Sequence, residues 1–202
     1  MLTKILLALP DLQGLVRLLS LLGLSALSLA APAARAQAFS DPGAGFGIQG
    51  GISKGTDADA VPIGRLHARY RLTGMVGVEL AAGHRNEEVR QQGAPFLRLA
   101  ETHLTGSFLL FFLFDHRVQP YLLGGGGYYY VSERGLGANA DYRGIEHLFG
   151  FHAGAGVDVR VSRSVSLFLD GRYTFLGIAS IPPDYTGNAD FSSLTVGVNL
   201  YF

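Results

Sequence analysis

The end of the chain alternates strictly between apolar and polar side chains, and this pattern restricts the possible folds more than any other feature of the sequence. Successive side chains of a β-strand point to opposite faces, so residues 193–202 are predicted to form a strand with one wholly apolar face. The apolar members are Leu194, Val196, Val198, Leu200 and Phe202. The positions between them hold Ser193, Thr195, Gly197, Asn199 and Tyr201.

The same rhythm recurs upstream, with turn residues between strand-sized stretches. Including the C-terminal one, these stretches number eight, and the other seven are 46–53, 65–72, 76–80, 97–114, 118–131, 149–159 and 165–175. The run Gly124–Gly127 interrupts the alternation within 118–131, so the sequence does not assign the faces of that stretch. No apolar run after residue 37 reaches the roughly 20 residues that a membrane-spanning helix needs.

The connections between these stretches alternate in length. The short ones are Thr73-Gly74, 115–117 and 160–164, and the longer ones are 54–62, 84–96, 132–146 and 177–190. A membrane-spanning strand takes about 9 to 11 residues, so eight strands leave ample chain for loops whereas sixteen would leave almost none. Short turns at one end and long loops at the other are typical of outer-membrane barrels.

The polar faces carry much Gly, Ser and Thr and few charges, which suits a crowded interior better than the solvated surface of a soluble sandwich. Seven aromatic residues lie near strand ends, where lipid headgroups would meet them: Tyr70, Phe112, Phe114, Tyr121, Tyr173, Phe175 and Phe202. The sequence therefore predicts an all-β fold, an eight-stranded antiparallel up-and-down transmembrane β-barrel with its apolar faces turned outward and both termini periplasmic.

The first 36 residues differ from the rest and predict a cleavable signal peptide. Lys4 and Arg17 flank leucine-rich stretches, and the apolar run from Leu18 to Ala31 leads into Ala34 and Ala36, the small residues of an A-x-A cleavage site. An uncleaved anchor would need about 18 consecutive apolar residues, which this region barely contains. We expect cleavage after Ala36, so that the domains are 1–36, signal peptide, and 37–202, outer-membrane β-barrel.

Composition restricts the partners of such a chain. Its 16 basic and 16 acidic residues balance, and the scattered Lys and Arg do not form the basic face that phosphate backbones require. We therefore expect no nucleic-acid partner. The chain has no cysteine, so an exported protein of this kind would gain its stability from closure of the sheet rather than from disulfides.

Charged residues on the polar faces would point into the barrel. An eight-stranded lumen is only wide enough to be filled by side chains, so these charges are expected to pair across it as a salt-bridge network. A gated path for protons or small solutes is the alternative that the sequence leaves open. The predicted lumen network consists of Arg65, His67, Arg69, Arg71, Glu79, Glu101, His103, Asp158, Asp170 and Arg172.

Several short motifs match known sites without the structural context that those sites need. Gly45–Gly50 fits a dinucleotide fingerprint and Gly51–Gly55 a nucleophile elbow around Ser53, but both motifs require a helix that is not predicted here. The six histidines lack zinc spacing. Four loop carboxylates could bind Ca²⁺ only weakly: Asp57, Asp59, Asp184 and Asp190. We expect no catalytic residue, no metal and no cofactor.

Three segments resemble the small bacterial outer-membrane β-barrels of the OmpA/OmpX type. They are Pro120–Gly127, PYLLGGGG; Leu167–Phe175, LFLDGRYTF; and Thr195–Phe202, TVGVNLYF. The last is similar to the signal that the outer-membrane assembly machinery reads, which would be carried by Thr195, Gly197, Leu200 and Phe202. The resemblance covers nearly all of residues 37–202 and implies an outer-membrane location, with membrane lipid and the assembly machinery as partners.

Members of that family include structural proteins, adhesins, narrow channels and a few lipid-modifying enzymes, so the resemblance does not transfer an activity. We expect a monomeric, non-enzymatic protein with a structural or surface-contact role in the cell envelope. A narrow channel for small or apolar solutes and a lipid A deacylase remain as alternatives. The deacylase would need a His and a Ser in close register on an outward face, and the sequence after His152 lacks that Ser.

Overall fold

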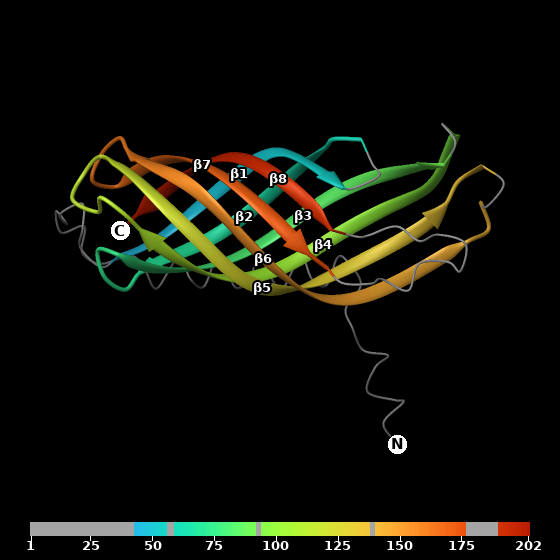
Figure 1. Ribbon diagram of the computed structural model, residues 1–202, viewed down its shortest axis with the longest axis horizontal. Coiled ribbons are helices and arrows are strands. Elements are labelled where there is room, and N and C mark those ends of the chain that lie inside the picture. Colours follow the sequence, from blue (N-terminus) through green and yellow to red (C-terminus); the bar gives the residue numbers. More distant parts are fainter. Residues whose placement is uncertain (1–42, 56–58, 92–93, 138–139, 177–189) are drawn as a thin grey trace, which may run out of the picture. The chain divides into compact units, whose positions relative to one another are not determined.

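The computed structural model describes residues 43–55, 59–91, 94–137, 140–176 and 190–202. The predicted signal peptide, its cleavage site, Asp57 and Asp184 lie outside these residues. The described residues form eight β-strands (Figure 1). Their bounds are β1 Gly43–Gly55, β2 Val61–Arg71, β3 Val76–Gln91, β4 Ala94–Phe111, β5 Val118–Gly135, β6 Arg143–Arg160, β7 Val165–Phe175 and β8 Phe191–Tyr201.

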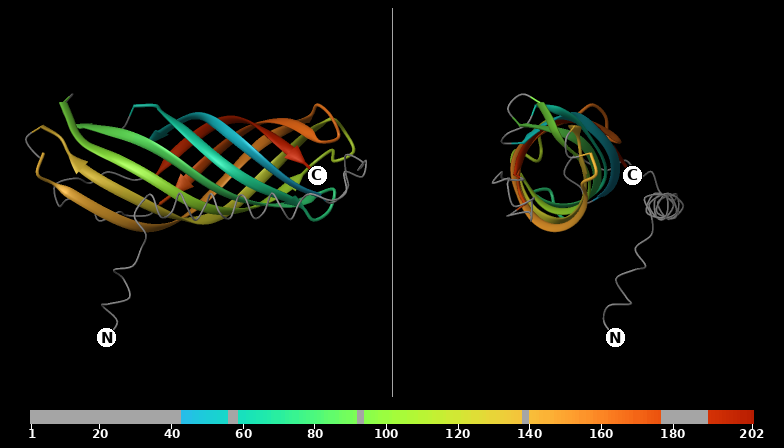
Figure 2. Two further views of the ribbon diagram at one scale, coloured as in Figure 1. Left: turned by 180° about the vertical axis from the view of Figure 1, so that it is seen from behind. Right: turned by 90° about the vertical axis from the view of Figure 1, so that its right-hand side faces the viewer.

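Each strand pairs antiparallel with its neighbours in the sequence, and β1 also pairs with β8, so the sheet closes into an up-and-down barrel. Viewed along its axis, the strands form a complete ring (Figure 2). Closure leaves no sheet edge, which is the condition for a sheet to lie in lipid. The predicted fold class is therefore confirmed. The described residues contain no helix long and apolar enough to cross a membrane.

The faces of the strands are inverted relative to a water-soluble protein. Phe149 and Phe151 on β6 are 79% and 73% exposed, whereas Asp158 on the same strand is completely buried. The C-terminal strand repeats this arrangement, with Leu194, Val196 and Leu200 exposed and the polar residues Ser193, Thr195 and Asn199 buried. The apolar stripe that would form a soluble core thus covers the outside of the barrel.

The connections lie in two groups. Residues 72–75, 112–117 and 161–164 form the short connections at one end, hereafter the turn end. The opposite end, hereafter the loop end, carries the connections after β1, β3, β5 and β7 (Figure 1).

The lengths of two predicted loops were wrong. Most of residues 84–96 and 132–146 belong to strands, because β3 continues to Gln91, β4 begins at Ala94, β5 continues to Gly135 and β6 begins at Arg143. The backbone hydrogen bonds of a sheet do not require an apolar face, so pairing continues after the apolar alternation has ended. The two hairpins β3–β4 and β5–β6 therefore project beyond the other strands (Figure 1).

One predicted aromatic position was also wrong. Tyr121 is 1% exposed and points into the barrel, where it packs on Phe111 with ring centroids 5.3 Å apart. Because Gly124–Gly127 interrupts the alternation of this stretch, the sequence alone does not assign the face of Tyr121. The register of β5 with β4 and β6 assigns it. Other members of the predicted girdle are exposed at strand ends: Tyr70, Phe112, Tyr173, Phe175 and Phe202.

Candidate functional site

Five residues from four strands meet in the middle of the lumen and form what we call the central cluster: Arg69, Glu79, Asp170, Arg172 and Tyr121. Glu79 bridges two arginines, since Arg69 Nε donates to its Oε2 at 2.6 Å and Arg172 Nη2 donates to its Oε1 at 2.8 Å. Arg172 also binds Asp170 through Nε at 2.6 Å, and the Tyr121 hydroxyl donates to Asp170 Oδ2 at 2.9 Å.

The barrel's register explains why these groups meet. Arg69 and Glu79 are directly opposite on β2 and β3, and Asp170 and Arg172 are two positions apart on the same face of β7. Strands β3 and β7 are not neighbours in the sheet, so the Glu79–Arg172 pair reaches across the lumen and ties opposite walls together.

The central cluster is shielded from water. The side chains of Arg69, Glu79 and Arg172 are at most 3% exposed, and the Arg69 guanidinium lies 4.2 Å from the ring centroid of Phe168. Removing a charge from water is unfavourable unless another charge and hydrogen bonds compensate it. Among the buried described residues, six arginines face seven carboxylates, so the interior is close to electrically balanced.

A second cluster lies toward the loop end and centres on Arg85. Arg85 binds Glu101 through Nη2 at 2.9 Å and Glu87 through Nη1 at 2.7 Å, and its guanidinium stacks 3.7 Å from the ring centroid of Phe191. His103 Nδ1 lies 3.0 Å from Glu101 Oε1. The Nε of Arg65 donates to His103 Nε2 at 3.3 Å, which extends this loop-side cluster toward the centre.

A third cluster lies toward the turn end and surrounds Asp158. Ser166 Oγ and Asn199 Nδ2 donate to Asp158 Oδ2 at 3.0 and 3.2 Å, and His67 Nε2 lies 2.6 Å from Asn199 Oδ1. Closer to the turn end, Arg71 donates to Gln119 Oε1. The Nε2 of Gln119 donates to the backbone carbonyls of Phe114 and His116 in the 112–117 connection.

All ten charged residues predicted to point inward are buried in the barrel. They lie in the three clusters and the Arg71–Gln119 pair, and Arg69 Nη1, 3.7 Å from Asp158 Oδ2, joins the central cluster to the third one. Arg85 and Glu87 were missed because residues 84–96 were expected to be a loop, and Tyr121 because its face was unassigned. Asn199 was missed because it carries no charge, and its position on the polar face of β8 was the only feature of the sequence that could have indicated it.

The motifs considered for catalysis have other contacts in the structure. Ser53 Oγ accepts a hydrogen bond from Arg85 at 3.2 Å, inside a strand and not at a turn. His152 does meet a serine, Ser107, at 2.8 Å, but both side chains are buried in the lumen and face away from lipid. Within the described ranges, no three His, Asp or Glu side chains are grouped closely enough to hold a metal ion.

The residues of the C-terminal signal divide between the two faces of β8. Thr195 points inward and donates to Gln49 Oε1 at 2.8 Å, while Leu200 and Phe202 are 50% and 44% exposed. Gly197 leaves room for the ring of Phe168, because an added Cβ would lie only 2.4 Å from it.

The comparisons with known proteins agree with this architecture. A family model described as outer membrane protein beta-barrel domain matches residues 19–202. Neisserial surface protein A is 18% identical, with a TM-score of 0.60 over 80% of this chain and 97% of that one. OprG from Pseudomonas aeruginosa is 15% identical, with a TM-score of 0.59 over 82% and 99% of the two chains.

Ail from Yersinia pestis is 12% identical, with a TM-score of 0.52 over 80% of this chain and 97% of that chain. No curated protein sequence matches the chain. At these sequence identities, the likeness to solved structures shows the fold alone.

Proposed function

Because the chain belongs to the outer membrane protein beta-barrel domain family, we propose that it is a non-enzymatic integral protein of the bacterial outer membrane with a structural or surface-contact role in the cell envelope. The turn end would face the periplasm and the loop end the cell exterior, as is usual for barrels with short turns and long loops. Membrane lipid would contact the exposed apolar faces, and the barrel would act as a monomer.

The observation that carries this proposal is the central cluster. The Arg69–Glu79–Arg172–Asp170 chain of ion pairs joins opposite walls at contact distances of 2.6 to 2.8 Å. A permeant ion would have to separate charges that are buried and paired, which is strongly unfavourable. The interior thus supports a rigid scaffold that presents its loop end to the surroundings.

Planar-bilayer recording tests the scaffold role. The purified protein is expected to give no discrete conductance steps, because the lumen is filled by paired side chains. Steps in the wild type that disappear in Glu79→Gln or Arg172→Gln would support the narrow channel instead. A changed lipid A mass spectrum on expression, absent from a vector control, would support the lipid-modifying enzyme.

Export and assembly belong to the same proposal. We propose cleavage after Ala36, and recognition of Thr195, Gly197, Leu200 and Phe202 by the outer-membrane assembly machinery. Phe202→Ser is expected to reduce the amount of barrel in the outer membrane several-fold. Phe112→Ser, at a turn-end aromatic of similar exposure, serves as the control. Equal yields for the two variants, or a mature N-terminus other than Gln37, would contradict these assignments.

A further inference from the structure

Three arginines form a row on the outer surface of the projecting hairpins. In the register of the sheet, Arg98 on β4 is opposite Arg134 on β5, and Arg134 is opposite Arg143 on β6. Each lies on the outward face of its strand and is exposed. Glu88 on β3 is opposite Arg98 and closes one side of the row. Directly opposed side chains in a sheet are about 5 Å apart, so the three guanidiniums can act on one ligand.

The protein neutralises only one side of this row. Arg98 binds Glu88 at 2.5 Å in an exposed pair. In the part of the chain that the structure describes, neither Arg134 nor Arg143 has a carboxylate within ion-pair distance. Like charges directly opposite one another destabilise a sheet. Two such pairs occur here, Arg98 opposite Arg134 and Arg134 opposite Arg143. An anion that bridged the row would remove the repulsion.

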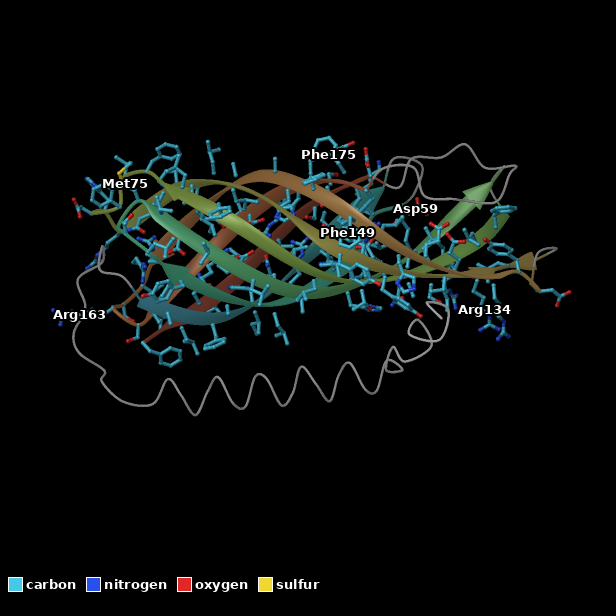
Figure 3. The ribbon with its side chains drawn as sticks, turned by 90° about the horizontal axis from the view of Figure 1, so that it is seen from below. Asp59, Met75, Arg134, Phe149, Arg163 and Phe175 are labelled. Atoms are coloured by element: carbon cyan, nitrogen blue, oxygen red, sulfur yellow. The ribbon has the colours of Figure 1, made fainter. Side chains whose placement is uncertain are left out.

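The position of the row indicates where that anion would come from. On the same outward faces, toward the middle of the barrel, lie the aromatic residues Tyr128 and Phe149, whose rings pack 5.5 Å apart. Six strand positions separate Tyr128 from Arg134, or ~20 Å along a strand at ~3.3 Å per residue. With a strand tilt of about 40°, the row stands ~15 Å above these aromatics. Figure 3 places Arg134 beyond Phe149, at the opposite end from Arg163.

We propose that Arg98, Arg134 and Arg143 bind the phosphorylated headgroup of an outer-leaflet glycolipid, lipopolysaccharide in chemical class. Aromatic belts lie at the level where acyl chains meet headgroups, so the arginines stand among the sugar phosphates. Guanidinium groups bind phosphate oxygens with two parallel hydrogen bonds. The row lies on the flank of the barrel, where a neighbouring lipid stands, which favours a lipid over a soluble polyanion. This inference rests on the proposed outer-membrane location.

Titration of the refolded protein in detergent with fluorescent bisphosphorylated lipid A tests the proposal. The variant Arg134→Gln/Arg143→Gln is expected to bind about 30-fold more weakly, at roughly five-fold per arginine near an anionic lipid surface. The control Arg117→Gln/Arg163→Gln removes the same charge from the turn end and should change binding less than about two-fold, because these residues lie far from the row. Dephosphorylated lipid A should bind the wild type as weakly as it binds the variant.

A second measurement separates a lost ligand from a damaged barrel. Without lipid A, the Arg134→Gln/Arg143→Gln barrel should unfold at the same or a higher temperature than the wild type, since like charges have been removed. Unchanged lipid A binding in this variant, or equal weakening in the turn-end control, would overturn the proposal. Binding of heparin through the same arginines without binding of lipid A would overturn it in favour of a soluble polyanion. Heat-modifiable migration on a gel, retained in every variant, shows that the barrel itself is intact.

Discussion

Glu79→Gln is expected to lower the free energy of unfolding of the barrel by about 3 to 5 kcal/mol, the usual consequence of removing one partner from a buried ion pair. Glu79 accepts hydrogen bonds from both Arg69 on β2 and Arg172 on β7, at 2.6 and 2.8 Å. A neutral amide in its place leaves Arg69 and Arg172 facing each other with less compensation in a site that excludes water. Urea unfolding of the folded barrel in lipid vesicles measures the change.

The control for this variant lies on the same strand and faces the outside. Glu88 also pairs with an arginine, Arg98, but both side chains are about half exposed. Exposed ion pairs contribute about 0.2 to 1 kcal/mol, so Glu88→Gln should have a small effect. Equal losses of unfolding free energy for the two variants would mean that the central pair is solvated and that paired side chains do not fill the lumen.

Gly125→Ala is expected to destabilise the barrel by about 2 kcal/mol, or to prevent its folding. Gly125 points into the lumen, and a Cβ there would lie 1.9 Å from the carbonyl oxygen of Gly106 and 2.8 Å from Ser107 Cα. These are backbone atoms of the paired strand, so relief requires β4 and β5 to separate locally. Inserting a methyl group where the backbone cannot relax costs about 1 to 3 kcal/mol. This cost exceeds the stabilisation that alanine provides by reducing the conformational entropy of the unfolded chain.

The neighbouring glycine provides the matched comparison. Gly124 faces outward, and the nearest atom to an added Cβ is the carbonyl oxygen of His152 at 3.8 Å. Gly124→Ala is therefore expected to be neutral or slightly stabilising in the same unfolding assay. If the two substitutions had similar effects, the inward assignment of Gly125 would be wrong.

The sequence predicted the orientation of side chains best where one face of a strand contacts lipid. On β7 and β8 the requirement for an apolar outer face imposes the alternation directly, so the inward positions of Asp170, Arg172 and Thr195 follow from the pattern. The same requirement is absent beyond the lipid, and the extensions of β3 to β6 were consequently expected to be loops. Arg85 and Glu87, which hold the loop-side cluster together, were missed for that reason.

Which side chains pair across the lumen was less predictable than which side chains point into it. Arg69 and Glu79 are joined by a short turn, so local sequence nearly determines their register. The contact of Glu79 with Arg172 depends on how the whole barrel is staggered when it closes, and no local pattern encodes that stagger. Tyr121 shows the same limit, because four consecutive glycines remove the alternation that would have assigned its face.

Tryptophan scanning tests the inverted arrangement of the faces most directly, because the chain contains no tryptophan. Single substitutions would be made at two pairs of nearby positions, one exposed and one buried in each pair: Leu169 and Phe168, and Phe108 and Phe111. In vesicles of lipids with brominated acyl chains, fluorescence should be strongly quenched at positions 169 and 108 and little affected at 168 and 111. Quenching at positions 168 and 111, with little at 169 and 108, would show that the apolar faces are turned inward and that the barrel is not inverted.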